Sequence, residues 1–555
     1  MRRVRDLARR AALAAVAAPG SKAVYYGAGP AALWGEPRDH ICGGMPDSEG
    51  GSVTAGRAMQ REWDFIIVGS GFGGSVAGLR LVEKGYRVLM LEKGARFGPD
   101  DFARTTWNLR RWLWAPSLGL RGPFRMTFLR HLTALSGVGV GGGSLIYGGV
   151  LQEPQDDAFF TAPSWRHLAD WRRELAPHYA TARRMLGAAE VPDHTYPDRA
   201  VRAVARALGR ERDHTPTTVG VFFGEPGETV PDPFFEGEGP DRTGCTHCGG
   251  CMVGCRYGAK NTLDRNYLWL AERNGLEIRD FSEVTAVRPR DGGYQVDVRE
   301  GRRPWPRRPR SYRAARVVLA GGVLGTVPLL LRLRNDPSGL PRLSPQVGEF
   351  VRTNSEVLMG VVAPGKEMSE GVAITSILRT GEHSTLEPVR YPSGSGVLRV
   401  LQAPHAPGET LARRLAAAAR RVLRHPLRTL RAWLVRDWAR RTLILLYMST
   451  DDSHLRLRRR RSGTLTTDAS SGRAPRASIP EATALGEAIA DYVGGYPVSF
   501  VMETLAGTPT TAHVLGGCVM GDWPETGVIG PDHQVWNYPG LYVIDGSAVS
   551  ANPGV

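Results

Sequence analysis

Lysine is scarce in this sequence of 555 residues. Only five of its 71 basic residues are lysine, and the formal net charge is +16. We attribute most of this arginine bias to a GC-rich genome rather than to a function. A nucleic-acid-binding role would require basic residues interleaved with aromatic ones on a recognisable module, and the sequence contains no such module. The composition therefore predicts no nucleic-acid partner.

Long apolar runs are absent as well. No stretch approaches the roughly 18 consecutive apolar residues that a membrane-spanning helix needs, which predicts a cytoplasmic or peripherally membrane-associated protein. The composition, 42% hydrophobic and 23% charged, is typical of a soluble globular protein. A chain of this length exceeds one ordinary hydrophobic core, so we expect two domains.

Cysteine is also rare, and four of the six cysteines form one run, at Cys245, Cys248, Cys251 and Cys255. The C-x₂-C-x₂-C-x₃-C spacing is one that binds a [4Fe–4S] cluster, although Arg256 stands where a proline usually follows. Three interpretations remain open: an iron–sulfur centre, a zinc or other structural metal site, and free or transiently oxidised thiols. Thiols clustered in this way favour a reducing compartment.

A glycine-rich turn follows a short apolar strand expected at 64–68. In a dinucleotide-binding turn, the first glycine permits the tight turn, the second lets the backbone approach a pyrophosphate, and the last lets helix and strand pack closely. A second strand, expected at 87–91, ends at Glu92, where a carboxylate can accept hydrogen bonds from a ribose. Strand, turn, helix and acid together predict a dinucleotide site. Its expected contacts are Gly69, Gly71, Phe72, Gly73, Gly74 and Glu92.

A second glycine-rich segment, 136–149, carries seven glycines among apolar residues. Such a backbone is expected to press against a large ligand with several amides pointing inward, whereas a flexible linker of this length would be polar. Glu92 disfavours the extra phosphate of NADP by charge, and the second segment favours FAD over NAD. The expected contacts from this segment are Gly141, Gly142, Gly143, Ser144, Tyr147 and Gly148.

These motifs, in this order, resemble those of the glucose–methanol–choline (GMC) flavin oxidoreductases and, within that family, the bacterial cholesterol oxidase branch. The resemblance covers about 63–555 and includes Ala512-His513-Val514-Leu515-Gly516-Gly517 near the end. It implies an α/β fold, with a Rossmann-like FAD-binding domain and a second, substrate-binding domain built on a mixed β-sheet. The implied FAD-binding domain is discontinuous, 59–340 with 505–555, and carries the cysteine insert 245–255. The implied substrate-binding domain is 341–504.

The resemblance also implies roles for single residues. It places the adenine at the backbone of Val284, and the ribityl and pyrophosphate groups at Asp545 and Gly546. His513 is expected to contact the substrate hydroxyl and to remove its proton. Glu387 is expected to face an apolar pocket, where a raised pKa would let it move a proton between ring carbons and isomerise a Δ5 double bond to Δ4.

The family pairs this histidine with an asparagine or a second histidine near the C-terminus. By position that residue would follow Val555, so we expect the sequence to be a fragment; Asn552 lies three positions too early for the role. Residues 1–58 do not match the family. We interpret them as a disordered or misassigned leader, and a twin-arginine export signal is the alternative that we do not favour.

The sequence therefore predicts FAD-dependent oxidation of a secondary alcohol to a ketone. By resemblance, the substrate is a hydrophobic alcohol such as the 3β-hydroxysterol cholesterol, and the electron acceptor is O₂ or an unknown carrier. One alternative is a dehydrogenase that passes electrons through an iron–sulfur centre at the four cysteines, and another is a flavin-binding protein without turnover. The segment 411–441 carries ten arginines and one acid. It is expected to be helical, and either solvated or in peripheral contact with an anionic membrane.

Overall fold

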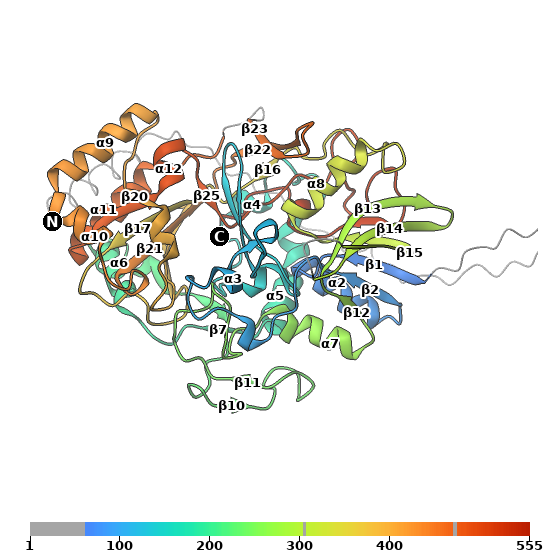
Figure 1. Ribbon diagram of the computed structural model, residues 1–555, viewed down its shortest axis with the longest axis horizontal. Coiled ribbons are helices and arrows are strands. Elements are labelled where there is room, and N and C mark those ends of the chain that lie inside the picture. The colour runs from blue at the N-terminus through green and yellow to red at the C-terminus, as the bar shows by residue number, and fades with distance from the viewer. Residues whose placement is uncertain (1–61, 303–306, 470–473, 555) are drawn as a thin grey trace, which may run out of the picture. The chain divides into compact units, whose positions relative to one another are not determined.

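The computed structural model describes residues 62–302, 307–469 and 474–554. The leader predicted at 1–58 lies outside these residues. Two seven-stranded sheets organise the described part of the chain, and Figure 1 shows them around β1 and β15 and around β17 and β21. Among the described helices, none has the length and apolar character needed to cross a membrane.

The first sheet is mixed. Five parallel strands place β1 between β2 and β15, with β12 beyond β2 and β26 beside the end of β15. An antiparallel pair, β13 and β14, extends the sheet from β15. In chain order, its strands are β1 (Trp63–Val68), β2 (Val88–Leu91), β12 (Glu277–Arg279), β13 (Ser282–Arg290), β14 (Gly293–Glu300), β15 (Arg308–Leu319) and β26 (Leu541–Val543).

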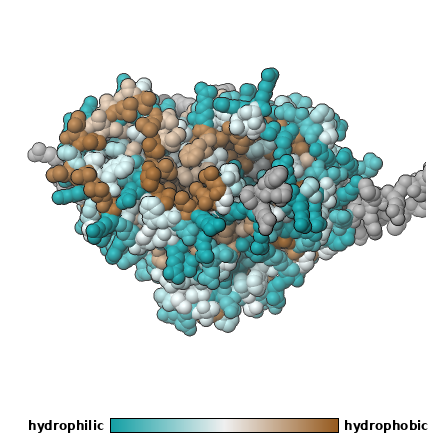
Figure 2. All heavy atoms as spheres, viewed as in Figure 1, coloured by the Kyte–Doolittle hydropathy of each residue, from teal (hydrophilic) through white to brown (hydrophobic). Residues whose placement is uncertain are grey.

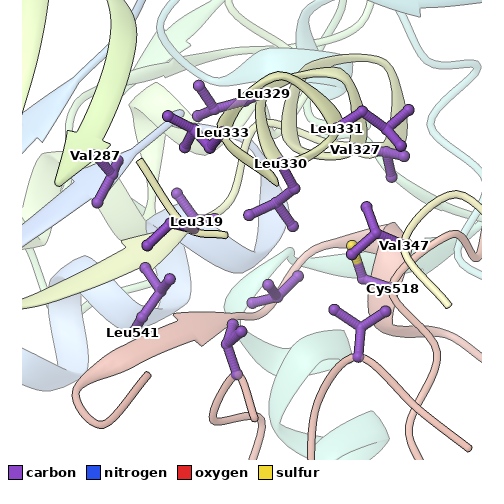
Figure 3. Close-up of a cluster of buried hydrophobic side chains, with 14 of the residues drawn as sticks. Val287, Leu319, Val327, Leu329, Leu330, Leu331, Leu333, Val347, Cys518 and Leu541 are labelled. Carbon is purple, nitrogen blue, oxygen red and sulfur yellow. The ribbon is translucent and has the colours of Figure 1, made fainter. Parts of the chain in front are cut away.

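Helices follow two of these parallel strands. α2 (Phe72–Val82) comes directly after β1, and α8 (Val323–Arg334) after β15, so the strand–turn–helix order predicted at the first glycine motif is present. Figure 3 shows Leu330 of α8 in one apolar cluster with Leu319 of β15 and Leu541 of β26. Segments from early and late in the chain therefore share the core of this sheet, which brings their loops together at its edge.

The second sheet is antiparallel at all six of its strand pairings. The mixed pairing therefore lies in the first sheet rather than the second. α6 (Tyr196–Ala207) and α11 (Pro480–Val493) pack against the sheet through a second apolar cluster. In spatial order, its strands are β20 (Gln402–Pro404), β24 (Tyr496–Phe500), β17 (Val357–Val362), β21 (Thr442–Ser449), β19 (Ser384–Val389), β18 (Ser376–Arg379) and β8 (His214–Pro216).

The domain limits 59–340, 341–504 and 505–555 stay a prediction. Two strands pack with the sheet of the other predicted domain. Strand β8 belongs to the second sheet although it precedes residue 341. Conversely, Leu455 and Leu457 of β22 (His454–Arg459) pack in the core of the first sheet, although they fall inside 341–504. Sequence boundaries follow the order of the chain, whereas each sheet draws strands from distant segments.

Further α-helices and strands lie outside these two sheets and the helices already named. The remaining helices are α3 (Leu109–Trp112), α4 (Asp157–Phe160), α5 (Trp171–Met185), α7 (Tyr267–Arg273), α9 (Leu411–Arg424), α10 (Pro426–Trp433) and α12 (Val501–Ala506). The remaining strands are β3 (Trp114–Ala115), β4 (Leu120–Arg121), β5 (Phe124–Phe128), β6 (Thr133–Gly137), β7 (Ala188–Glu190), β9 (Thr218–Gly220), β10 (Thr229–Val230), β11 (Arg242–Thr243), β16 (Val351–Arg352), β23 (Leu465–Ala469) and β25 (Thr510–Thr511).

Candidate active site

A cavity of about 1,100 Å³ is lined by residues of both sheets. Its volume exceeds the roughly 300–1,000 Å³ of a typical small-molecule pocket. One part of its lining comes from the two glycine-rich segments, and another from apolar side chains of the second sheet. The cavity is therefore large enough to hold a dinucleotide with a second molecule beside it.

The packing around the first glycine turn requires glycine at several positions. A Cβ at Gly74 would overlap the carbonyl oxygen of Gly69, and one at Gly73 would overlap that of Ile544. A Cβ at Gly71, in contrast, would meet no protein atom within 4 Å, and Gly71 lines the cavity. The turn thus packs tightly on its protein side and leaves free space at the start of α2, where backbone N–H groups attract a pyrophosphate.

The second glycine-rich segment folds back onto this turn. A Cβ at Gly142 would lie 2.6 Å from the Cα of Gly71, so the two backbones touch. The hydroxyl of Ser144 donates to the carbonyl of Gly141 at 2.6 Å, which closes a tight turn. The predicted cofactor contacts that line the cavity are Gly69, Gly71, Phe72, Gly73, Glu92, Gly142, Gly143, Tyr147, Gly148, Val284, Asp545 and Gly546. Gly74, Gly141 and Ser144 are outside this lining and act by shaping the turns.

Two carboxylates in this part of the cavity wall are held by hydrogen bonds. Glu92 accepts from the N–H (3.2 Å) and the hydroxyl (2.8 Å) of Ser70, and from the N–H of Gly94 (2.8 Å). Asp545 accepts from the N–H of Gly322 at 2.8 Å, and burial raises the pKa of Asp545. Both side chains are therefore fixed in place by the protein itself.

The imidazole of His513 is held by a buried carboxylate that the sequence analysis missed. His513 Nδ1 lies 3.1 Å from Oε2 of Glu356, which directly precedes β17 and is 2% exposed. The other oxygen of Glu356, Oε1, accepts the N–H groups of Ala512 (3.0 Å) and His513 (3.3 Å) and the hydroxyl of Thr511. Because Nδ1 faces Glu356, Nε2 is the ring nitrogen that stays available to bind a ligand. His513 lines the cavity in which such a ligand would lie.

Carboxylates set the protonation of this imidazole. Burial opposes the charged form of His513, but the charge and hydrogen bond of Glu356 and the charge of Glu387 outweigh burial and raise the pKa of His513. Glu387, in β19, is 3% exposed and lines the same cavity. Burial raises the pKa of Glu387 to about 7, a shift that His513 opposes and Glu356 increases. The structure therefore brings both predicted catalytic residues to one cavity, as groups suited to exchange protons near neutral pH.

The wall contributed by the second sheet and the segments next to its strands is mainly apolar. Its lining includes Leu358, Met359, Ile374, Val389, Tyr391, Leu398, Trp438, Ile444, Leu446, Met448, Val498 and Phe500. Such a wall favours a large hydrophobic ligand, and a ligand that fills it excludes water from the reacting groups.

Asn552 has a structural role. Its side-chain amide donates to the carbonyl oxygens of Ser449 and Asp451, both at 2.9 Å, and Asn552 is outside the cavity lining. The exclusion of Asn552 as a catalytic residue stays a prediction. Glu356, in contrast, gave no sequence signal, because it lies 157 residues before His513 in the chain and no motif surrounds it.

The four clustered cysteines form no metal site. Within residues 62–302, 307–469 and 474–554, no three His, Cys, Asp or Glu side chains converge as metal ligands. Cys245 and Cys251 pack in an apolar cluster instead, and Cys248 is exposed. The buried ammonium of Lys260 donates to the carbonyl oxygens of Cys251 (2.6 Å) and Leu145 (3.0 Å). The described residues therefore give no support to the iron–sulfur and zinc interpretations, and Lys260 ties the cysteine turn to the second glycine-rich segment.

Family models match three parts of the chain. Two models described as GMC oxidoreductase match residues 239–352 and 443–555, and a model described as an NAD(P)-binding Rossmann-like domain matches residues 67–108. The last match contains the first glycine turn, and the second contains His513.

Known proteins match over most of the chain. A cholesterol oxidase from Mycobacterium tuberculosis (strain ATCC 25618 / H37Rv) is 44% identical over 90% of this chain and 89% of its own length. A cholesterol oxidase from Acinetobacter baumannii is 39% identical, with 89% and 91% covered. Among solved structures, pyridoxine 4-oxidase from Mesorbium loti matches with a TM-score of 0.57 and 17% identity, covering 89% of this chain and 96% of that one. This last likeness supports the fold alone.

Proposed function

Because the chain belongs to the GMC oxidoreductase family, we propose that it oxidises the 3β-hydroxyl group of a sterol to a ketone. The family match makes the protein an FAD-dependent alcohol oxidase. Two relatives of 39% and 44% identity are cholesterol oxidases, which supports a sterol as the substrate. The observation that carries the proposal is the apolar part of the cavity, which is continuous with the dinucleotide-binding turns and with His513.

The residues of the glycine-rich segments fit FAD. The free space beside Gly71 suits the pyrophosphate, and Glu92 suits the adenosine ribose. Gly142 and Gly143 supply a second stretch of backbone along the same cavity. FAD held by these residues would supply the acceptor for the hydride of the carbinol carbon.

His513 is the residue that we assign to the hydroxyl proton. With Nδ1–H donated to Glu356, a neutral imidazole presents Nε2 as a hydrogen-bond acceptor. The proton that leaves the hydroxyl group is then held on Nε2, and the carboxylate of Glu356 stabilises the imidazolium. The apolar wall keeps water away, which strengthens these electrostatic interactions.

Glu387 supports a second step, the isomerisation of a Δ5 3-ketone to its Δ4 isomer. The carboxylate removes a proton from the carbon between the carbonyl group and the double bond. The carboxylic acid that results returns a proton at the far end of the double bond, so no oxidant is consumed. A pKa of about 7 suits a group that must act first as a base and then as an acid near neutral pH.

We propose O₂ as the electron acceptor, because the two relatives of 39% and 44% identity are oxidases by name. Reduction of O₂ by two electrons and two protons yields H₂O₂. An iron–sulfur carrier is not proposed, since no group of metal ligands lies among the described residues.

Turnover with cholesterol tests this proposal. The FAD-loaded protein should consume O₂ and release H₂O₂ and a 3-ketosteroid, with kcat/KM for cholesterol above that for small alcohols such as 2-propanol. His513→Asn should lower turnover by roughly 10²–10⁴-fold with FAD still bound. His131→Asn, which changes an imidazole outside the cavity lining, is the matched control. Oxidation of small alcohols alone would refute the sterol assignment, and turnover only with an artificial acceptor would refute the oxidase assignment.

A further inference from the structure

Helices α9 and α10 turn large apolar side chains toward solvent. Six leucines of this segment are between 46% and 79% exposed: Leu411, Leu415, Leu423, Leu427, Leu430 and Leu434. They recur at intervals of three, four and eight residues, so successive turns present them on one side of each helix. Figure 2 shows hydrophobic residues gathered over the region where Figure 1 labels α9 and α10. We call this surface the α9–α10 face.

Unpaired arginines border the α9–α10 face. Six are exposed and form no ion pair with an acidic group among the described residues: Arg413, Arg420, Arg424, Arg428, Arg431 and Arg436. The acid in this segment, Asp437, is engaged by the hydroxyl of Ser393 and the N–H of Gly394. An apolar surface with six uncompensated cations complements a ligand that is both apolar and anionic.

The inner side of the same segment packs against the cavity wall. Ala432 and Val435 are buried in a cluster with Leu398 and Trp438, and these last two residues line the cavity. The indole Nε1 of Trp438 donates to Oε1 of Gln402 in β20 at 2.7 Å, which joins the segment to the second sheet. A surface that contacts the outer leucines would therefore lie across this packed layer from the apolar part of the cavity.

We propose that the α9–α10 face docks on an anionic phospholipid bilayer. The leucines enter the boundary between headgroups and acyl chains, and the arginines contact lipid phosphates. A large exposed apolar patch marks an interaction site in general, and the uncompensated positive charge favours an anionic lipid surface over a second copy of this chain, which would bring like charges together. Docking itself does not depend on the sterol assignment, whereas delivery of a membrane-dissolved substrate to the cavity rests on the proposed function.

Co-sedimentation with lipid vesicles tests docking in the absence of any sterol. The FAD-loaded protein should bind vesicles of phosphatidylcholine with phosphatidylglycerol, bind phosphatidylcholine alone more weakly, and lose affinity at high salt. Replacing Arg424, Arg428, Arg431 and Arg436 together by Gln should weaken binding roughly 10²–10³-fold. The double variant Leu427→Gln/Leu434→Gln should weaken binding roughly 10-fold or more, because two side chains that are each 69% exposed lose their apolar burial.

Matched controls change the same chemistry elsewhere on the surface. Trp523→Gln/Tyr257→Gln removes two larger exposed apolar side chains, 65% and 46% exposed, outside α9 and α10. Arg173, Arg184, Arg290 and Arg308, all exposed, are replaced together by Gln as the charge control. Both controls should bind anionic vesicles as the unmodified protein does. Equal losses in controls and test variants would overturn the proposal, as would failure of the unmodified protein to bind anionic vesicles.

Two further readouts separate docking from the proposed activity. With cholesterol in detergent micelles, the α9–α10 variants should keep unmodified turnover, whereas with cholesterol in anionic vesicles they should turn over at least about 10-fold more slowly. Vesicle binding without oxidation of any sterol would leave docking supported and the proposed function refuted. Sedimentation velocity tests whether a second copy of the chain covers the α9–α10 face instead. The proposal would be overturned if the unmodified protein did not bind vesicles but formed a dimer, and if the Leu427→Gln/Leu434→Gln variant abolished that dimer.

Discussion

The hydrogen bonds around Glu356 make a specific prediction for the variant Glu356→Gln. Oε1 of Glu356 accepts the N–H groups of Ala512 and His513, which can only donate. The amide oxygen of a glutamine must occupy that position, so its NH₂ group faces His513 Nδ1. Nδ1 then has to accept, which places the ring proton on Nε2 and removes the acceptor that the substrate hydroxyl requires.

The loss follows from the role assigned to Nε2. A general base contributes roughly 10²–10⁴-fold to a reaction rate, and Glu356→Gln should forfeit most of that factor in the reduction of the flavin by the alcohol. The carboxylate and its hydrogen bond raise the pKa of His513 against the effect of burial. The acidic limb of the pH profile of kcat/KM should therefore also move to lower pH, by roughly one to two units for a charged hydrogen bond of about 1.5–3 kcal/mol.

Single-turnover absorbance under anaerobic conditions measures this effect, with the ratio of FAD to protein checked first. Glu356→Asp, which keeps a carboxylate, serves as the conservative variant and should regain part of the rate. Flavin reduction within about threefold of the unmodified rate in Glu356→Gln, with an unchanged pH profile, would show that Glu356 does not control the tautomer of His513.

Two further predictions concern the cavity, and a third concerns the cysteine run. Glu387→Gln should keep alcohol oxidation but accumulate the Δ5 3-ketone, which lacks the absorbance of a conjugated enone. The raised pKa of about 7 leaves Glu387 as a carboxylate only above that pH. Isomerisation by the unmodified protein should therefore fall as the pH drops through 7. An unchanged Δ4 product in Glu387→Gln would contradict this role. Gly71→Val should fold with an unchanged circular dichroism spectrum yet bind no FAD, since an added Cβ meets no protein atom within 4 Å and Gly71 lines the cavity. A yellow variant would disprove that placement. Elemental analysis should find no stoichiometric iron at the cysteine run, and four irons per chain would restore the cluster interpretation.

The first glycine turn was predictable because its strand, its closely spaced glycines and its helix follow one another directly in the chain. Gly74 packs against Gly69 in the same turn, whereas Gly69 and Gly73 pack against Ala320 and Ile544, which are distant in the chain, so the local pattern encodes the turn and not all of its packing partners. Spacing alone therefore identified the turn, its strand and its helix. The second glycine-rich segment was predictable for the same reason, and the cavity lining contains most of the contacts expected from both.

Glu356 shows where sequence reasoning ends. Its pairing with His513 depends on how β17 of the second sheet meets the loop after β25, and the two residues are 157 positions apart. No local pattern encodes such a contact. The assignment of β22 to the core of the first sheet was missed for the same reason, because strand pairing between distant segments depends on packing of the whole molecule.

The cysteine run is the opposite case, a sequence pattern that the described residues do not support. Its spacing matched a metal-binding pattern. Spacing along the chain gives only the order of the possible ligands, and it does not show that their sulfur atoms meet around one metal ion. Burial of Cys245 and Cys251 in an apolar cluster directs these side chains into the core. In place of a metal, the ammonium of Lys260 holds the turn through backbone carbonyl oxygens.

The central claim is that the apolar cavity places a sterol hydroxyl between His513 and the flavin of bound FAD. Anaerobic mixing of the FAD-loaded protein with cholesterol, unlabelled or carrying deuterium at the carbinol carbon, tests it most directly. We expect the flavin absorbance to bleach in one turnover, and to bleach more slowly with the deuterated sterol. A flavin that stays oxidised with sterols while small polar alcohols reduce it would contradict the account.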